Sequence, residues 1–371
     1  MDKDNQQQLQ LKEEDEPPGS KRLLINDPSS FSGKELTAFY PFYFENLLSR
    51  NLQNYYHQNG HLVFLKSLNV EVVTEMDFCH KLWDEFSPRK SIFELWEFRY
   101  AFWRGYQYVP YFMVLKNGKN LGLLPLWYEE DQKKFFWFGS YWHEDNKFFV
   151  RDPMFIPLLL SICPVRTILN SLDLETAIYA KEFIVFDRDC PKYVLNLEKF
   201  NTLANYLAFF DKKTRYNLKR DRRIIESQKP EIVIDNFTDF NHLAELSRGR
   251  FKQKGELSSW EDPRRIATFE EIIKIGKKNK PFRARMITVK IGDKIAGVDL
   301  IALYNGCYTP LVCGYDVVNF PGIGNFMNLV EIEDALNFGM KRLDFLQSNF
   351  GHKDSWKERL FEEIPLFKYT K

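Results

Sequence analysis

A proline and two glycines stand where a predicted strand gives way to a predicted helix. Pro321, Gly322 and Gly324 follow an apolar strand pattern and precede a helical one. The strand ends at Tyr315, and the helix ends at Gly339. A glycine loop at a helix N-terminus presents unpaired backbone N–H groups and the positive end of the helix dipole, without obstructing side chains. This chemistry suits a phosphate, and we expect the rest of the chain to be organised around this loop.

Several groups near the loop could accept a proton from an attacking amine. Asp316 follows the strand, and Glu331 lies within the helix. Asp344 and His352 lie near the exit of the next predicted strand. A lone carboxylate on a helix is more often solvated or used as a cap, so the identity of the base stays open.

A cluster of basic residues between positions 212 and 223 is the second charged feature. Its members are Lys212, Lys213, Arg215, Lys219, Arg220, Arg222 and Arg223, interrupted by one acid, Asp221. The cluster is either a solvated helix face, or a place where arginines and lysines hold a phosphate-bearing ligand, or an RNA surface. Tyr216 is the one aromatic residue interleaved with these charges, which is few for stacking RNA bases.

Composition limits the number of domains and the kinds of partner that the chain is expected to have. The chain has 371 residues and is 44% hydrophobic, which favours two domains with an aromatic-rich core. The net charge of +1 gives no global field for DNA or for an anionic membrane. Five scattered cysteines indicate neither a disulfide framework nor a metal site. No secretory signal or membrane span is expected, and a cytoplasmic location is the default.

Composition and pattern also divide the chain. Residues 1–30 are polar and acidic, so we predict a disordered tail. Residues 31–68 are rich in Phe and Tyr and are expected to dock on the first domain or on a partner. Residues 69–200 form the first predicted α/β domain, and residues 201–371 form the second, which carries the glycine loop.

The two domains repeat one order of elements. In the first, a strand at 69–74 precedes helices at 77–86 and 91–104 and strands at 108–115, 120–128 and 134–138. In the second, a strand at 231–235 precedes helices at 239–251 and 268–278 and strands at 283–290, 294–304 and 307–315. Duplication of one fold is the economical explanation. Between the repeats, one helix and two strands are expected within 151–200, followed by a single long helix over 201–227.

These motifs resemble the CelD/BcsL-like acetyltransferases, a GNAT-superfamily group allied to the Fem-type peptidyltransferases. The resemblance runs from about Val70 to the C-terminus. It rests on these pieces: Trp96 in SIFELWEFRYAF, Leu121-Gly-Leu-Leu-Pro-Leu, Phe138-Gly139, Arg215-Tyr-Asn-Leu-Lys-Arg220, Pro321-Gly322, Leu343-Asp-Phe345, Lys353 and Trp356. It implies an α+β fold of two tandem GNAT-like units, each a mixed, mostly antiparallel sheet flanked by helices. The first unit lacks the glycine loop.

The resemblance further implies an acyl-CoA donor, in most cases acetyl-CoA, whose pyrophosphate sits on the loop from Phe320 to Asn325. The expected donor contacts are Tyr315, Phe320, Gly322, Ile323, Gly324 and Asn325. The pantetheine arm would lie along the strand at 310–315. The superfamily pattern Gln/Arg-x-x-Gly-x-Gly/Ala is altered here, because Asn319 stands where a cation or a longer amide is usual.

Further site residues follow from the same match. Lys353 is expected to contact the donor or the developing charge, next to His352 and Trp356. Trp96, Arg215, Arg220, Trp260 and Trp356 are the expected substrate contacts. The catalytic candidates are Lys353, Glu331, Asp316 and His352, and no metal is expected.

Three functions are compatible with these residues. The leading hypothesis is an acyl-CoA-dependent N-acyltransferase acting on an amino-sugar, a cell-envelope precursor or a similar small amine. The second is a Fem-type transferase that takes an aminoacyl group from tRNA, with the basic cluster holding phosphates. The third is a degenerate acyltransferase that serves as a non-catalytic binding module.

Overall fold

The computed structural model describes residues 67–139, 142–181, 183–347 and 361–371. The two segments predicted at 1–30 and 31–68 therefore lie outside the described residues, apart from the last two positions. So do Lys353, His352 and Trp356 of the predicted site.

The first half of the chain begins with a strand, two helices and an antiparallel meander. Its elements are β1 (Asn69–Val73), α4 (Met76–Phe86), α5 (Trp96–Tyr106), β2 (Val109–Asn117), β3 (Lys119–Glu129), β4 (Lys134–Trp137), β5 (Phe149–Val150), α6 (Ile156–Ile162), β6 (Ile168–Leu172), α7 (Leu174–Ala180), β7 (Asp187–Arg188) and β8 (Lys192–Asn196). The sheet order is β1-β2-β3-β4, with β5 also paired to β3. Continuous apolar runs joined by an Asn-Gly turn explain the meander, since Asn117–Gly118 joins β2 to β3.

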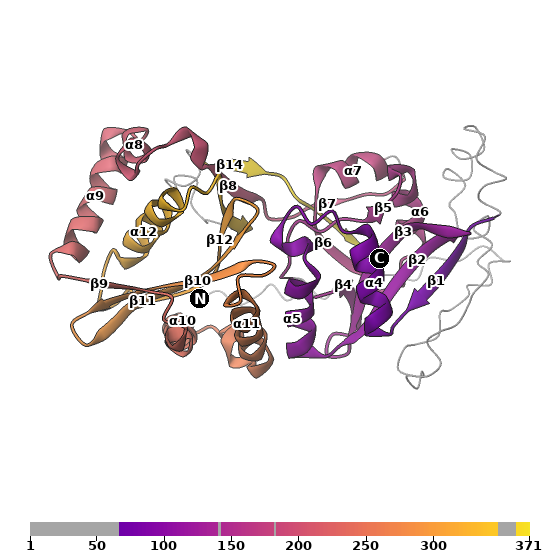
Figure 1. Cartoon of the computed structure of the whole chain (residues 1–371), viewed down its shortest axis with the longest axis horizontal. Coiled ribbons are helices and arrows are strands. Elements are labelled where there is room, and N and C mark those ends of the chain that lie inside the picture. The colour runs from indigo at the N-terminus through magenta and orange to yellow at the C-terminus, as the bar shows by residue number, and fades with distance from the viewer. Residues whose placement is uncertain (1–66, 140–141, 182, 348–360) are drawn as a thin grey trace, which may run out of the picture. The chain divides into compact units, whose positions relative to one another are not determined.

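The second half repeats this order. Its elements are α8 (Leu203–Ala208), α9 (Lys212–Glu226), β9 (Glu231–Ile234), α10 (Phe240–Gln253), α11 (Pro263–Gly276), β10 (Arg283–Ile291), β11 (Lys294–Tyr304), β12 (Cys307–Tyr315), α12 (Ile323–Asn337), β13 (Arg342–Gln347), β14 (Glu362–Ile364) and β15 (Phe367–Thr370). Helices α10 and α11 cover one side of the sheet, and α12 covers the other with α9 packed on it (Figure 1). The predicted duplication and the α+β fold class of two tandem units are confirmed.

The last strands of each half are exchanged. β8 lies before residue 200, yet it pairs with β13 and β14 in the seven-stranded sheet of the second half. In return, the C-terminal β15 pairs with β6 and β7 of the first half. The two sheets therefore interleave across residue 200, where the sequence predicts a domain boundary.

Two predictions between the repeats are wrong. The segment 151–200 holds two helices, α6 and α7, and three strands rather than one helix and two strands. The helix predicted over 201–227 is broken between α8 and α9, because Asp211 caps α9. Its carboxylate accepts the Thr214 N–H at 2.9 Å and the Thr214 hydroxyl at 2.7 Å. Both pieces nevertheless bury an apolar face, formed by Leu203 and Leu207 on α8 and by Leu218 and Ile225 on α9.

The halves share an aromatic core between α5 and α11. Phe98 packs edge-on against Phe282 at 5.8 Å between ring centroids, and Phe102 packs against Phe269 at 6.0 Å. Gly105 lets the two helices approach, since a Cβ at this position would lie 2.0 Å from the Thr268 hydroxyl oxygen. This core fixes the second sheet, and hence the glycine loop, against the first half.

Candidate functional site

Strands β12 and β13 diverge directly below the glycine loop. They are parallel and pair only through Cys307 with Arg342 and Tyr308 with Leu343. From residue 309 to Tyr315, the edge of β12 that faces β13 has no described strand partner. The register with β11 also shifts opposite Leu300 and Ile301, which leaves an extra residue in β12. An extended ligand could therefore pair with the free edge of β12.

The glycine loop begins helix α12 at the open end of this edge. Gly322 is the N-cap, with φ of 92°, and no side chain caps the helix. That left-handed backbone explains the glycine, because residues with a Cβ are strained there. Gly324 has ordinary surroundings, since an added Cβ would meet only the Tyr315 ring, at 3.6 Å or more. The predicted phosphate-binding role of this helix N-terminus stays a prediction.

Asp316 and Asn319 hold each other at the entrance of the loop. The Asp316 carboxylate accepts the Asn319 backbone N–H at 3.0 Å and its side-chain amide at 2.7 Å. The Asp316 carbonyl also accepts the Phe320 N–H at 3.1 Å. These bonds order the turn and use both oxygens of the predicted base, so the structure accounts for Asp316 as a turn residue.

Helix α9 supplies the flank of the loop. The Asn325 amide donates to Oδ2 of Asp221 at 2.7 Å, and a Cβ at Gly322 would lie 3.2 Å from the Asp221 Cβ. Arg220 donates to the other Asp221 oxygen through Nε at 3.0 Å. Of the two arginines predicted to bind substrate, Arg220 therefore lies beside the loop. Arg215 instead donates to the Ala208 carbonyl at 3.3 Å.

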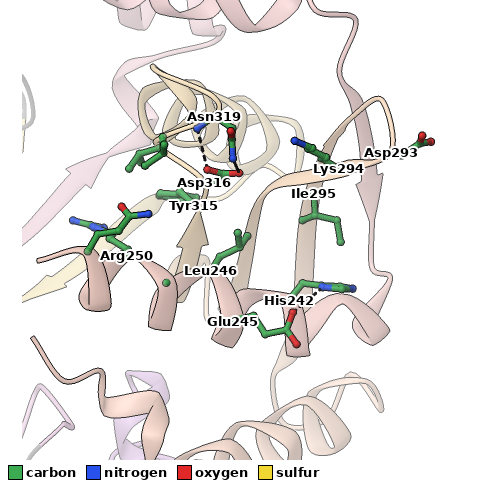
Figure 2. Close-up of a pocket in the computed structure, with 14 residues that line it drawn as sticks. His242, Glu245, Leu246, Arg250, Asp293, Lys294, Ile295, Tyr315, Asp316 and Asn319 are labelled. Atoms are coloured by element: carbon green, nitrogen blue, oxygen red, sulfur yellow. Dashed lines mark hydrogen bonds and ion pairs between the residues drawn. The ribbon is translucent and has the colours of Figure 1, made fainter. Parts of the chain in front are cut away.

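A pocket of about 600 Å³ lies on the other flank, between α10 and the end of β12 (Figure 2). It is lined by His242, Glu245, Leu246, Gly249, Arg250, Gln253, Asp293, Lys294, Ile295 and residues 315 to 319. Lys294 extends toward Asp316, whereas Asp293 points away from the pocket. Glu245 pairs with His242 at 3.3 Å, but Arg250 and Lys294 have no ion-pair partner in the described chain. Arg250 and Lys294 therefore offer positive charge in the pocket that Asn319 lines. The loop itself contains no cationic residue.

Tyr315 is half-buried beside the loop, and Glu331 is fully buried within α12. The Tyr315 ring lies next to Gly297, where a Cβ would be 3.1 Å from it. Burial, together with the neighbouring Asp299 carboxylate, holds the pKa of Tyr315 well above its usual value. Glu331 is 1% exposed, on the face of α12 that packs against the sheet. Its burial separates it from the pocket, and its catalytic role stays a prediction.

A buried ionic cluster joins the halves where β12 and β13 diverge. Lys192 on β8 bonds Asp145 and Asp344 at 2.7 Å each, with Glu144 at 3.9 Å. Glu144 also accepts the Gln347 N–H. Burial raises the pKa of Asp344, although Lys192 opposes the shift, and raises the pKa of Glu144 to about 8. Asp344, one of the predicted bases, is therefore engaged with Lys192.

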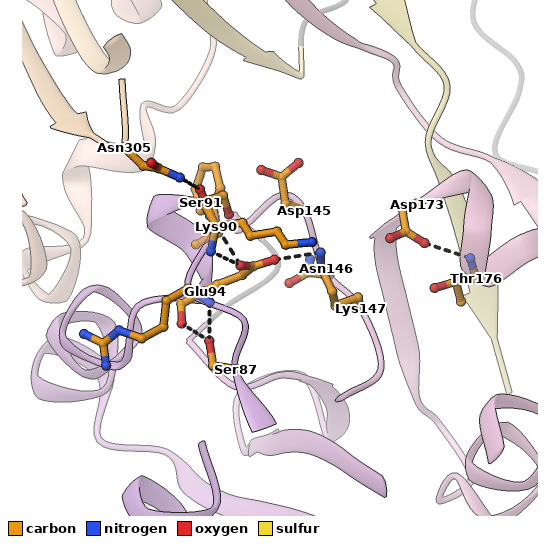
Figure 3. Close-up of polar contacts among 12 residues, drawn as sticks. Ser87, Lys90, Ser91, Glu94, Asp145, Asn146, Lys147, Asp173, Thr176 and Asn305 are labelled. Atoms are coloured by element: carbon orange, nitrogen blue, oxygen red, sulfur yellow. Dashed lines mark hydrogen bonds and ion pairs between the residues drawn. The ribbon is translucent and has the colours of Figure 1, made fainter. Parts of the chain in front are cut away.

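A second network lies next to this cluster in the first half (Figure 3). The Glu94 carboxylate accepts the Lys90 N–H and pairs with Lys147 at 2.6 Å. The Lys90 carbonyl in turn accepts the Asn305 amide from the second half at 3.0 Å. These contacts tie the turn between β11 and β12 to the first half.

The two tryptophans predicted to bind substrate lie in the core. Trp96 is stacked between His80 and Phe138, at 4.6 and 5.3 Å between ring centroids. Trp260 is 3% exposed and packs against Phe240. A packing role explains both, because neither presents an open ring to a ligand.

Sequence reasoning missed the residues that other elements bring to the loop or to the place where β12 and β13 diverge. Arg250 and Lys294 come from α10 and β11, and Lys192 and Glu144 come from the exchanged strand and the first half. The repeated element order was the one signal for α10 and β11, and no local pattern marks Glu144.

Comparisons with known proteins agree with this geometry. Residues 212–354 match the family described as acetyltransferase (GNAT) domain. FemX has a similar structure, with a TM-score of 0.52 and 12% identity, covering 81% of this chain and 97% of that one. L-PGS from Bacillus licheniformis is similar with a TM-score of 0.51 and 12% identity, and the match covers 80% of this chain and 92% of that one. A protein of unknown function from Bacteroides thetaiotaomicron is similar with a TM-score of 0.51 and 9% identity, and the match covers 80% of this chain and 98% of that one. No curated protein matches the sequence.

Two searches of the described residues bear on cofactors and membranes. No helix there is long and apolar enough to cross a bilayer. No group of three or more His, Cys, Asp or Glu side chains in this part of the chain is placed to hold a metal ion.

The match and the topology identify the same half of the chain. The matched segment contains the meander β10 to β12, the glycine loop, α12 and β13. The first half repeats the meander, with α6 and β6 in the places of α12 and β13. The chain is thus a protein of the GNAT-like fold, with two units in tandem and an acetyltransferase-type domain in the second.

Proposed function

We propose that the chain is an acyl-CoA-dependent N-acyltransferase, of the CelD/BcsL-like kind, whose donor site is the second unit. The observation that carries this proposal is that, among the described residues, the pairing of β12 with β13 stops at Tyr308, and that β12 then leads to a helix N-terminus at Gly322 that no side chain caps. A donor with a phosphate head and an extended acyl arm matches both parts. The proposed location is the cytoplasm.

The residues fit such a donor. Backbone N–H groups of Gly322 and Gly324 face no capping side chain and could hold a pyrophosphate, whereas the Ile323 N–H donates to the Phe320 carbonyl at 3.1 Å. Arg250 and Lys294 would supply the charge that Asn319 lacks. Backbone groups of the irregular part of β12 could bond the thioester carbonyl and stabilise the negative charge that develops on it. When bound, acyl-CoA supplies an activated carbonyl with a thiolate leaving group.

The acceptor is proposed to be a small amine, such as an amino-sugar or an envelope precursor. In the balanced step, the amine nitrogen bonds the acyl carbon, the carbon–sulfur bond breaks, and the nitrogen loses one proton while the thiolate gains one. The place where β12 and β13 diverge is where the acyl end of a donor running down from the loop would lie. The first unit, which contacts this place through Glu144 and Asp145, is proposed to shape the acceptor site.

Thiol release from acetyl-CoA tests this function. The purified chain is incubated with acetyl-CoA and a panel of small amines that includes glucosamine and lysine, and free thiol is followed with time. Acceptor-dependent release by wild type, reduced in Gly324→Asp, is the expected result. Release that is equal in both proteins would refute the proposed donor site.

A further inference from the structure

The exposed face of α9 alternates cations with apolar side chains. Phe209 at the end of α8 is 61% exposed, Tyr216 is 58% exposed and Ile224 is 42% exposed. Lys212, Lys213, Lys219, Arg220 and Arg223 are the exposed cations around them. On a helix, residues spaced by three and four positions share a face, so the side chains on α9 form one surface. Phe209 is exposed just before the N-terminus of this helix. We call it the α9 face.

Most cations of the α9 face have no acidic partner. Lys212, Lys213 and Lys219 form no ion pair with any described residue, and Arg223 donates only to the carbonyl of Lys219. Asp221 pairs with one cation of the face, Arg220, and also bonds Asn325, whereas Glu226 pairs with Arg222 outside the face. The other four cations of the face are therefore not neutralised within the described chain.

The position of two of these lysines also argues against a purely stabilising role. Lys212 and Lys213 occupy the first turn of α9, which has no acidic residue. A cation in the first turn opposes the helix dipole and destabilises the helix. The helix is held instead by the Asp211 cap and by Leu218 and Ile225, which are buried on the opposite face.

We infer that the α9 face binds an anionic membrane surface, with Phe209, Tyr216 and Ile224 entering the headgroup region and the lysines contacting lipid phosphates. A helix that lies in the interface needs cations and apolar side chains on an accessible, convex surface. A single nucleic-acid strand instead uses a groove with flat aromatic rings, and Ile224 offers no ring. The pocket described above lies toward α10 rather than on this face.

Vesicle binding by the full chain tests the inference. Flotation is measured with phosphatidylcholine vesicles that contain either no anionic lipid or about a third phosphatidylglycerol. We expect binding only to the anionic vesicles. Lys212→Gln with Lys213→Gln and Lys219→Gln should weaken it about a hundredfold, since each lysine near such a surface contributes about a fivefold factor.

Two further variants make the result specific. Lys252→Gln with Lys254→Gln and Lys278→Gln removes the same charge from exposed positions on the other side of the sheet, and should change binding by less than about twofold. Tyr216→Ser with Ile224→Ser keeps the charge but should weaken binding about tenfold. Circular dichroism verifies that each variant is folded.

The following outcomes overturn the inference. The first is that the wild-type chain does not float with anionic vesicles. The second is that the triple variant of the α9 face and the control triple variant weaken vesicle binding equally. A third is tight binding of single-stranded oligouridylate that depends on the three lysines, while Tyr216→Ser with Ile224→Ser leaves vesicle binding unchanged. That pattern would assign the α9 face to RNA. None of these outcomes depends on the acyl donor.

Discussion

The side-chain amide of Asn325 on α12 donates a hydrogen bond of 2.7 Å to Oδ2 of Asp221 on α9. This bond joins the basic helix to the glycine loop, two features that lie about a hundred positions apart in the sequence. It also places a carboxylate beside the N-terminus of α12, where the proposed donor phosphate would sit. Asp221 therefore stabilises the loop and would compete electrostatically with an anion bound there.

Replacement of Asp221 by Asn should separate these two effects. The amide oxygen can still accept the Asn325 bond, but the negative charge is lost and Arg220 is released. We expect acetyl-CoA to bind about five- to tenfold more tightly, because a unit charge a few ångströms away contributes about 1 kcal/mol in a solvated site. Titration calorimetry at low salt measures the change. Unchanged or weaker binding would show that Asp221 does not face the donor.

The two loop glycines should respond differently to alanine. Gly322→Ala forces a Cβ into a left-handed backbone and toward Asp221, which should cost about 1–2 kcal/mol of stability. Gly324→Ala meets only ordinary contact with Tyr315 and should change stability by less than about 0.5 kcal/mol. Urea unfolding of both variants checks this. Equal losses would contradict the described loop geometry.

Lys192 should be the most sensitive cation at the junction of the halves. Lys192→Met leaves Asp145 and Asp344 without their shared partner in a buried site, and should lower the free energy of unfolding by about 3–5 kcal/mol. The half-buried pair of Lys116 with Glu71 on β2 and β1 is the matched control. Lys116→Met should cost less than about 1 kcal/mol. A small loss for Lys192→Met would mean that the cluster is open to water.

Glu144 should give the protein a pH-dependent stability. Its pKa is raised by burial to about 8, so the folded chain keeps a proton that the unfolded chain loses near pH 4.5. The folded state binds more protons between these values, and this group therefore lowers stability as pH rises from about 4.5 to 8. Glu144→Gln retains the oxygen that accepts the Gln347 N–H, and should remove that decline.

Urea unfolding between pH 5 and 9 measures the difference between wild type and Glu144→Gln. Glu129→Gln serves as a comparison, because burial raises the pKa of Glu129 to about 7, away from the junction. The effect of Glu129→Gln on the pH dependence of stability should level off about one pH unit lower than the effect of Glu144→Gln. Parallel curves for wild type and Glu144→Gln would contradict a protonated Glu144.

The sequence predicted local elements well and non-local contacts poorly. Strands β11 and β12 begin and end at the predicted residues, because apolar runs and the Asn-Gly turn between them specify them locally. The break before α9 was missed, because one Asp cap at position 211 outweighs a continuous apolar seam. The exchange of β8 and β15 has no local signal, since it depends on which sheet edge each strand meets.

In the candidate site, too, local features were predicted from the sequence and non-local contacts were not. Gly322 was identified because only a glycine suits its backbone, whereas Arg250 and Lys294 approach from elements whose faces periodicity alone does not orient. Trp96 and Trp260 were assigned to substrate, yet their rings fill the aromatic core, because large aromatic residues are as suited to packing as to binding.

The central claim is that the glycine loop of the second unit binds an acyl-CoA donor, and calorimetric titration of acetyl-CoA into the full chain tests it most directly. Wild type and Gly324→Ala should be compared with Gly324→Asp, which adds a charged side chain at the proposed phosphate position. We expect wild type to bind and Gly324→Asp to lose at least tenfold in affinity. Absence of binding in wild type across several acyl-CoAs, or equal binding by Gly324→Asp, would contradict it.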